Sequence, residues 1–340
     1  MQSKLYLRWN FFWVLLLTIF VFGSAYAGKY DDKFKYQEVV EKNFSVKNGQ
    51  VLIIDTDRGS VQIVGGSGNE VTVKVIKGAN RVSKDRAEEM FDRFRLDFNQ
   101  TRDGVEIYGE YSKPGFWRSS FWNRLKVIYE IEVPSTFDLD IVTSGGSVEV
   151  ENVNGEIRLK TSGGSLRLDE LTGDIQARTS GGSVTAKNIT GDAYLKTSGG
   201  SIKVMDCVGS IQCKTSGGSI TAEGMSGELE AHTSGGGIRL IDISGQVNAS
   251  TSGGSIKAEL VGQPSGPVYL KTSGGSVTLY MDEDVKADID ARTSGGRVRV
   301  DFPVKVRGKI SRSRLRGELN GGGPLLTLRS SGGGIKLVRR

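Results

Sequence analysis

The 340-residue chain contains few of the residues that most often supply chemistry or shape the backbone: one histidine, two cysteines and six prolines. A proton relay of the Ser-His-Asp type therefore has one candidate base, His232. Two cysteines without a Cys/His cluster argue against a zinc site, and six prolines exclude a collagen triple helix. No P-loop or dinucleotide-binding glycine motif stands between a strand and a helix. We expect neither a metal nor a cofactor.

The first 27 residues have the features of an export signal. Lys4 and Arg8 precede an apolar run from Phe11 to Phe22, and Ala25 and Ala27 are small residues at a cleavage point. The apolar run is shorter than the ~20 residues that cross a bilayer as a helix. We expect cleavage after residue 27 and a mature protein in the periplasm, at the cell surface or outside the cell.

Glycine is abundant, with 47 residues, and much of it belongs to a repeated Thr-Ser-Gly-Gly motif. The first seven copies follow one another at 18-residue intervals, the next two at 21, and Ser330-Ser331-Gly332-Gly333 is a degenerate last copy. The threonines are Thr143, Thr161, Thr179, Thr197, Thr215, Thr233, Thr251, Thr272 and Thr293. A fixed period of this length is the signature of a stacked-repeat protein.

Apolar residues stand at fixed offsets within each copy and alternate with polar ones, as half-buried strands require. One two-stranded copy cannot bury its own apolar face, whereas stacked copies cover one another. The sequence thus predicts an all-β, single-stranded β-solenoid of about ten coils. We expect the Gly-Gly pair to turn one corner with positive φ and single glycines such as Gly173 to turn the other. The threonines should point inward, where their hydroxyls can bond one another.

Residues 28–140 are less periodic, and we expect them to form an N-terminal cap of strands and one short helix over residues 84–93. Residues 141–340 form the repeats and end in a basic coil, because twelve basic residues face two acidic ones from Arg297 to Arg340. We expect Pro303, Pro324 and the degenerate last copy to cap that end.

These residues resemble a family of exported bacterial β-solenoid domains that are described as adhesins and whose function is unknown. The resemblance rests on the repeated T-S-G-G-[SG]-[IVL]-x-[VLA] unit, on Ile131-Glu132-Val133-Pro134, and on the glycine-rich segments 317–323 and 331–335. It covers residues 40–340. The resemblance implies a right-handed solenoid in the cell envelope and supplies no catalytic residue.

Basic residues precede the threonines of several copies and form the first set of candidate anion-binding residues: Lys160, Arg178, Lys196 and Lys214. In-register stacking places them about 4.8 Å apart, where like charges repel. Either the side chains spread into screening solvent, or they form a stripe for an anionic envelope polysaccharide or lipid surface. A second candidate cluster follows near the C-terminus: Arg307, Lys309, Arg312, Arg314 and Arg316. We do not expect nucleic acid as a partner, because export removes it and base-reading motifs are absent.

Two further features leave alternatives open. The aromatic residues Phe116, Trp117, Phe121 and Trp122 form either a contact with a membrane or partner, or part of the end cap. Cys207 and Cys213 both stand at inward offsets, either as buried thiols or as a disulfide.

The predicted function is that of a non-catalytic, adhesin-like binding or scaffolding module at the cell envelope. His232 stands in the basic column and is expected to be a surface replacement for lysine rather than a catalytic base. The alternatives are a lyase-like glycan-processing enzyme built on a β-helix and a self-associating structural protein of the envelope.

Overall fold

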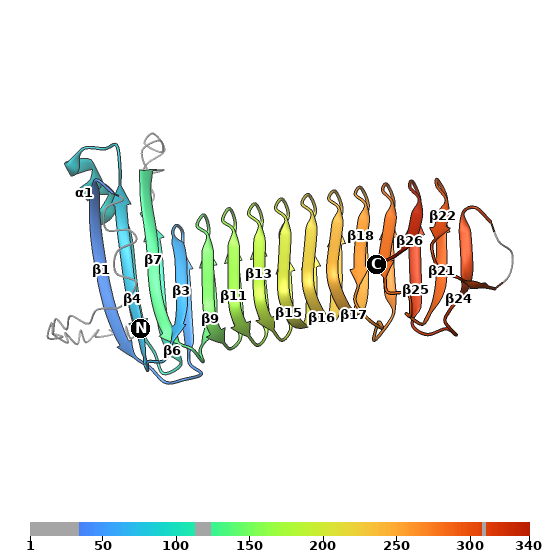
Figure 1. The fold of residues 1–340 in the computed structure, drawn as a ribbon. Coiled ribbons are helices and arrows are strands. Elements are labelled where there is room, and N and C mark those ends of the chain that lie inside the picture. Colours follow the sequence, from blue (N-terminus) through green and yellow to red (C-terminus); the bar gives the residue numbers. More distant parts are fainter. Residues whose placement is uncertain (1–33, 113–123, 308–310) are drawn as a thin grey trace, which may run out of the picture.

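The computed structural model describes residues 34–112, 124–307 and 311–340, and it confirms an all-β solenoid. The coils stack along one axis into a rod, and the C-terminus lies against the side of the rod rather than at its extremity (Figure 1). Each regular coil contributes one strand to each of two faces, which we call face A and face B.

Face A contains the strands that lead up to the repeated threonines. They are β8 (Asp138–Thr143), β10 (Ile157–Thr161), β12 (Ile175–Thr179), β14 (Ala193–Lys196), the second halves of β15 (Ile202–Lys214), β16 (Ile220–Thr233) and β17 (Ile238–Thr251), and β19 (Val268–Thr272). Face B contains the strands that follow the Ser-Gly-Gly corner. They are β9 (Val148–Asn154), β11 (Leu166–Thr172), β13 (Val184–Thr190), the first halves of β15 to β17, β18 (Ile256–Leu260) and β20 (Val277–Met281).

Neighbouring coils pair in parallel and in register over the regular repeats. Ile157 lies opposite Ile175, and Thr161 lies opposite Thr179. The strand residues alternate between buried and exposed, so the apolar columns of the two faces meet inside the rod as one continuous core. The 18-residue period of the sequence is therefore the length of one coil.

The repeated threonines are buried, as the sequence predicts, but their hydroxyls do not bond one another. The Thr179 hydroxyl donates to the Gly164 carbonyl oxygen of the preceding coil at 2.7 Å, and it accepts from the Gly182 amide at 3.3 Å. The same donation to a carbonyl recurs from Thr143 to Thr293. Each hydroxyl thereby satisfies backbone groups that the corner leaves without a ladder partner.

The expectation of positive φ at the paired glycines is wrong, because those residues do not adopt left-handed backbone. Their second glycine is required for close approach instead: a Cβ on Gly182 would lie 2.1 Å from the Gly164 carbonyl oxygen. At the opposite corner the expectation is confirmed, since Gly173 has φ of 121° and Gly191 has φ of 124°.

At the N-terminal end the coils do not follow one another in sequence order. The coil made of β2 (Val51–Thr56) and β3 (Ser60–Gly66) lies between β8 and β9 on one side and β6 (Gly104–Tyr111) and β7 (Leu125–Pro134) on the other. Three antiparallel strands then finish this end: β4 (Glu70–Ala79), β1 (Tyr36–Ser45) and β5 (Phe94–Gln100). Parallel ladders thus join strands that precede residue 140 to strands that follow it, as β3 is joined to β9. The domain boundary placed at residue 140 stays a prediction.

The short helix is confirmed as α1 (Lys84–Asp92), which buries Ala87, Met90 and Phe91. Ser83 stands at its N-cap position without donating or accepting a side-chain capping bond. The helix lies at the end of the rod beside β1 and β4 (Figure 1).

The C-terminal end repeats this interlocked arrangement. The last coil, made of β25 (Leu325–Ser330) and β26 (Ile335–Arg339), lies between β19 and β20 on one side and β21 (Ala287–Thr293) and β22 (Val298–Val300) on the other. The degenerate copy is therefore inside the stack, and the expectation that it caps the end is wrong. Two other strands, β23 (Lys305–Val306) and β24 (Arg314–Leu319), close this end by antiparallel pairing.

The two glycines of one corner provide a matched test of the close approach. Gly182→Ala should destabilise the fold by roughly 1–3 kcal/mol, because its Cβ would overlap a backbone oxygen of the preceding coil. Gly181→Ala should leave stability unchanged or raise it by up to about 1 kcal/mol, since its Cβ would lie 3.6 Å from the nearest atoms. Chemical denaturation of both variants measures the difference, and equal losses would contradict the close-approach argument.

Candidate anion-binding site

The predicted basic column forms one outward-facing row on face A. The pairing register places Lys160, Arg178, Lys196 and Lys214 on consecutive strands, so the row is confirmed as a geometric feature. It continues toward the C-terminal end, and we call the whole set row A: Lys160, Arg178, Lys196, Lys214, Lys271, Arg329, Arg292 and Arg314. His232 and Ser250 stand between Lys214 and Lys271 in this line.

Several contacts reduce the repulsion between the like charges of row A. The ring of Tyr194 lies beneath the Arg178 guanidinium at 5.0 Å and 5.9 Å from the Lys214 ammonium. Lys214 also lies 3.7 Å from a Glu230 carboxylate oxygen. By contrast, Lys160 and Lys196 are exposed and form no ion pair with another described residue. They remain available for an external anion.

The predicted C-terminal cluster is divided by ion pairs. Arg307 pairs with Glu318, and Arg316 pairs with Asp290 at 3.2 Å. Burial raises the pKa of Asp290, but hydrogen bonds from Arg329 and Arg316 outweigh it and hold the pKa below its ordinary value. The exposed Arg312 and Arg314 form no ion pair with a described residue. Lys309 lies outside the described residues.

A second row on face B was missed in the sequence. Its basic residues stand six positions after the repeated threonines, and we call them row B: Arg167, Lys203, Arg239, Lys257, Lys336 and Arg299. Threonines occupy the intervening positions, as Thr185 does between Arg167 and Lys203. The offset of six residues can be read from the sequence, but threonines alternate with the basic residues, so the column does not stand out as basic. All six basic side chains are exposed.

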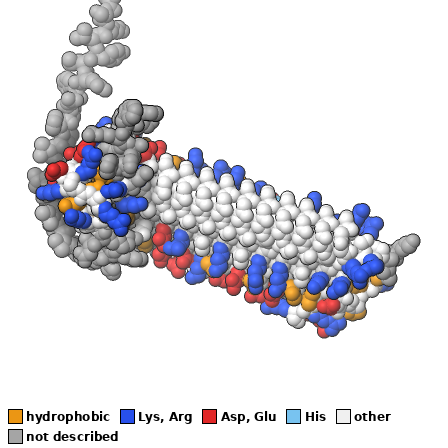
Figure 2. All heavy atoms as spheres, turned by 90° about the horizontal axis from the view of Figure 1, so that it is seen from above, with side chains coloured by type: hydrophobic (Ala, Val, Ile, Leu, Met, Phe, Trp, Pro, Cys, Tyr) orange, Lys and Arg blue, Asp and Glu red, His pale blue; other side chains and the backbone are white. Residues whose placement is uncertain are grey.

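Between the two rows lies the corner formed by the Ser-Gly-Gly-Ser segments, which we call the serine edge. It contains residues 144–147, 162–165, 180–183, 198–201, 216–219, 234–237, 252–255, 273–276, 331–334 and 294–297. No acidic residue occurs in any of these segments, and only Arg297 is charged. Figure 2 shows the edge as an uncharged band with Lys and Arg side chains along both sides, interspersed with Asp and Glu side chains along one of them.

His232 forms a three-residue arrangement that the sequence reading did not anticipate. Its Nδ1 lies 2.6 Å from Ser250 Oγ, and its Nε2 lies 2.6 Å from Glu230 Oε1. This connectivity resembles a Ser-His-acid triad, but the residues lie on the flat surface of neighbouring strands β16 and β17. Parallel ladders to β16 and β19 use the backbone N–H groups around Ser250, so these described strands offer no free backbone N–H as an oxyanion donor. His232 and Ser250 instead occupy the two positions of row A between Lys214 and Lys271 at which no lysine or arginine stands.

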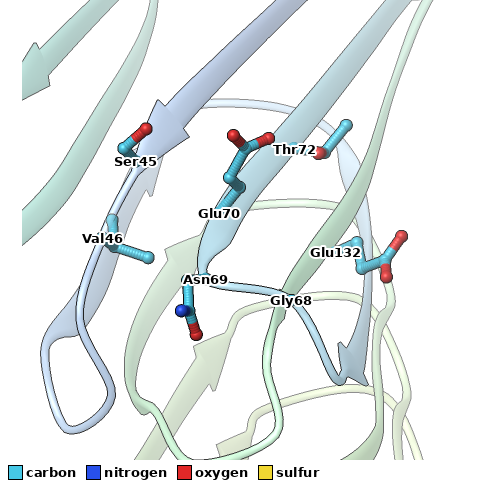
Figure 3. A pocket seen from close by; sticks show the side chains of 7 residues that line it. All are labelled: Ser45, Val46, Gly68, Asn69, Glu70, Thr72 and Glu132. Atoms are coloured by element: carbon cyan, nitrogen blue, oxygen red, sulfur yellow. The ribbon is translucent and has the colours of Figure 1, made fainter. Parts of the chain in front are cut away.

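The fold also contains a pocket near the N-terminal end, lined by Ser45, Val46, Gly68, Asn69, Glu70, Thr72 and Glu132. Figure 3 shows the carboxylates of Glu70 and Glu132 pointing in different directions. No basic side chain lines this pocket, so it offers no counter-charge to an anion.

Cys207 and Cys213 are buried and free, which decides between the two alternatives in favour of thiols. Burial raises the pKa of both, and Cys207 adds to the rise at Cys213. The Cys207 thiol donates to the Met205 carbonyl oxygen at 3.1 Å.

Other predicted features cannot be placed. The export signal and the aromatic residues Phe116, Trp117, Phe121 and Trp122 lie outside the described residues. Within the described part of the chain, no helix is both long and apolar enough to span a membrane. In the same ranges, no group of three or more His, Cys, Asp or Glu residues is arranged to hold a metal ion.

Residues 49–337 match the model of the Toastrack DUF4097 family. The chain belongs to this family. Membership confirms the resemblance on which the adhesin-like expectation drew. No protein with a curated function matches the chain.

Three solved structures similar to this Toastrack chain are of low sequence identity. A proposed adhesin from Parabacteroides distasonis is 12% identical with a TM-score of 0.45, covering 88% of this chain and 97% of that one. A proposed lipid-binding protein from the same organism is 14% identical with a TM-score of 0.42, covering 88% and 96%. A proposed adhesin from Bacteroides fragilis is 11% identical with a TM-score of 0.34, covering 89% and 97%. At these values the similarity carries no argument about what the Toastrack chain binds.

The buried thiols of the Toastrack chain should be unreactive in the native state. We expect dithionitrobenzoate to label neither cysteine at pH of about 9, above the ordinary thiol pKa of ~8.5, because burial disfavours both thiolates. After unfolding in guanidinium without reductant, both should react. Labelling of neither thiol after unfolding would show a disulfide, and rapid native labelling would contradict their burial.

The Ser250–His232–Glu230 arrangement should not hydrolyse esters. We expect the Toastrack chain and its Ser250→Ala variant to cleave p-nitrophenyl acetate at the same slow rate, because the backbone N–H groups beside Ser250 are already bonded within the sheet and cannot stabilise the developing oxyanion. A rate that falls about a hundredfold in Ser250→Ala would instead identify a catalytic serine.

Proposed function

We propose that this protein is an exported, adhesin-like scaffold of the cell envelope that binds an anionic glycan or lipid head group without catalysis. The observation that carries the proposal is row A, in which basic side chains occupy successive strands about 4.8 Å apart. The fold does not need this arrangement, since the core is complete on the opposite side of each strand.

The architecture suits such a role. Every interior coil is held by parallel ladders on both sides, so the row is supported by a rigid element rather than by loops. Basic side chains fixed in a line lose little further freedom on binding and act on the same ligand together. Export brings the row to the compartment in which envelope polymers and lipid surfaces are found.

The alternatives receive less support from the described contacts. A lyase-like enzyme needs acidic and basic groups gathered in a cleft, whereas the pocket in Figure 3 holds two carboxylates and no basic side chain. A second pocket beside α1 does gather acidic and basic side chains, but its Glu89 is held in ion pairs with Arg86 and Arg93. Self-association through the rod ends would have to pair the antiparallel edge strands, such as β1 and β5, and no described contact favours it.

Removal of charge from row A should weaken binding to a polyanion. We expect residues 28–340 to be retained on immobilised dextran sulfate, and Lys160→Gln/Lys196→Gln/Lys271→Gln to elute at lower salt. Each of these exposed lysines lacks an ion pair with a described residue, so neutralisation should not disturb the fold.

The matched control is Lys42→Gln/Lys47→Gln/Lys126→Gln, which removes the same charge from exposed positions in the N-terminal region. This control should elute with the parent. An equal shift in the two variants would reveal an effect of net charge alone and contradict a site on row A. A parent that is not retained would contradict the proposed function.

A further inference from the structure

The serine edge carries hydrogen-bond donors that the fold does not use. The Ser183 amide donates to Ser165 Oγ at 3.2 Å, and the Ser201 amide donates to Ser183 Oγ at 3.3 Å. The same bond recurs in other coils. Each of these hydroxyl oxygens therefore accepts from the backbone, and its hydrogen has no acceptor among the described residues. The result is a line of fixed oxygens whose O–H groups can donate outward.

Basic side chains stand on both sides of this line, and on face B acidic ones lie among them, such as Glu149 at 3.3 Å from Arg167. Lys160 and Arg167 stand two positions outside the Ser162–Ser165 segment, one on each face of the same coil. Row A and row B therefore flank the serine edge, as the basic side chains on both sides of the uncharged band in Figure 2 show. A ligand on the edge would meet neutral donors beneath it and positive charge at both sides.

We propose that the serine edge binds a linear, polyanionic glycan that lies lengthwise along the rod between row A and row B. This inference rests on the proposed function and specifies the ligand and its orientation. Hydroxyl donors and ammonium or guanidinium groups are the partners that sulfate, phosphate and carboxylate oxygens require.

The repetition of the edge favours a polymer over a single head group. Successive coils present nearly the same set of groups about 4.8 Å apart along a straight line. One head group can use the donors of one or two coils, whereas a polymer uses many and gains from their fixed spacing. Apart from Arg297, the edge consists of serine and glycine, with no apolar side chain to insert into a lipid surface.

Contacts with row B distinguish a ligand on the serine edge from a ligand bound by row A alone. Thr185, Thr221 and Thr278 keep its basic residues one or two strands apart, so their repulsion is lower than in row A. A ligand confined to face A would not reach them. A ligand on the edge would meet both rows.

The test uses residues 28–340, size-fractionated dextran sulfate, and vesicles containing phosphatidylglycerol. We expect affinity per sulfate to rise with chain length until the polymer spans the edge. Lys203→Gln/Arg239→Gln/Lys336→Gln should bind long fractions roughly tenfold more weakly than the parent. The Lys42→Gln/Lys47→Gln/Lys126→Gln control should bind as the parent does. Circular dichroism and the melting temperature confirm that each variant is folded.

Each of the other outcomes would overturn a defined part of the proposal. If the row B variant binds like the control while the row A variant loses affinity, the site lies on face A, and the edge is wrong although the proposed function stands. Equal affinity per sulfate at every length, or tighter binding to vesicles than to polymer of equal charge, overturns the lengthwise polymer. If the parent binds neither probe, this inference and the proposed function both fail.

A separate set of variants tests whether the serine hydroxyls contact the ligand. Ser165→Ala/Ser183→Ala/Ser201→Ala should weaken the binding of long fractions without changing its salt dependence, because no charge is removed. The control Ser210→Ala/Ser226→Ala/Ser244→Ala places the same change away from the edge. Equal affinities for the two folded variants would exclude the hydroxyls as ligands.

Discussion

The fold depends on the contact between a buried threonine and the second glycine of the preceding coil. The Thr179 hydroxyl reaches the Gly164 carbonyl because neither Gly164 nor Gly182 carries a side chain at that corner. Repetition of this contact fixes the register of the coils. Register in turn decides whether outward side chains are scattered or aligned, so both basic rows follow from a bond inside the rod.

The two rows reduce the repulsion between their aligned charges in different ways. Row A places cations on adjacent strands and moderates them with Tyr194, with Glu230 and with the break at His232 and Ser250, where no lysine or arginine stands. Row B spaces many of its cations with threonine. Among the described residues of the two rows, Lys214, Arg329 and Arg167 form ion pairs, and the other cations remain exposed. Such a pattern is difficult to explain by stability alone, because like charges directly opposite one another destabilise a sheet.

The sequence predicted the interior of the rod well, because neighbours along the chain are also neighbours in space there. The 18-residue period fixed the coil length, the burial of Thr161 and the alignment of Lys160 with Arg178. At the ends this relation is lost. Every copy offers the same apolar face, so nothing in the pattern distinguishes a last coil that caps the stack from one inserted between β19 and β21. The ion pairs of Arg307 and Arg316 depend on the antiparallel path of β24, which no repeat encodes.

The interlocked ends restrict how a protein of this kind can change its length in evolution. A copy added at either terminus would have to displace a coil that is already held between two neighbours. A duplication within the regular interior meets no such obstacle: eighteen new residues would insert one coil and move the ends apart intact. The number of interior coils, and with it the length of the rod, can therefore change while the structure of both ends stays the same.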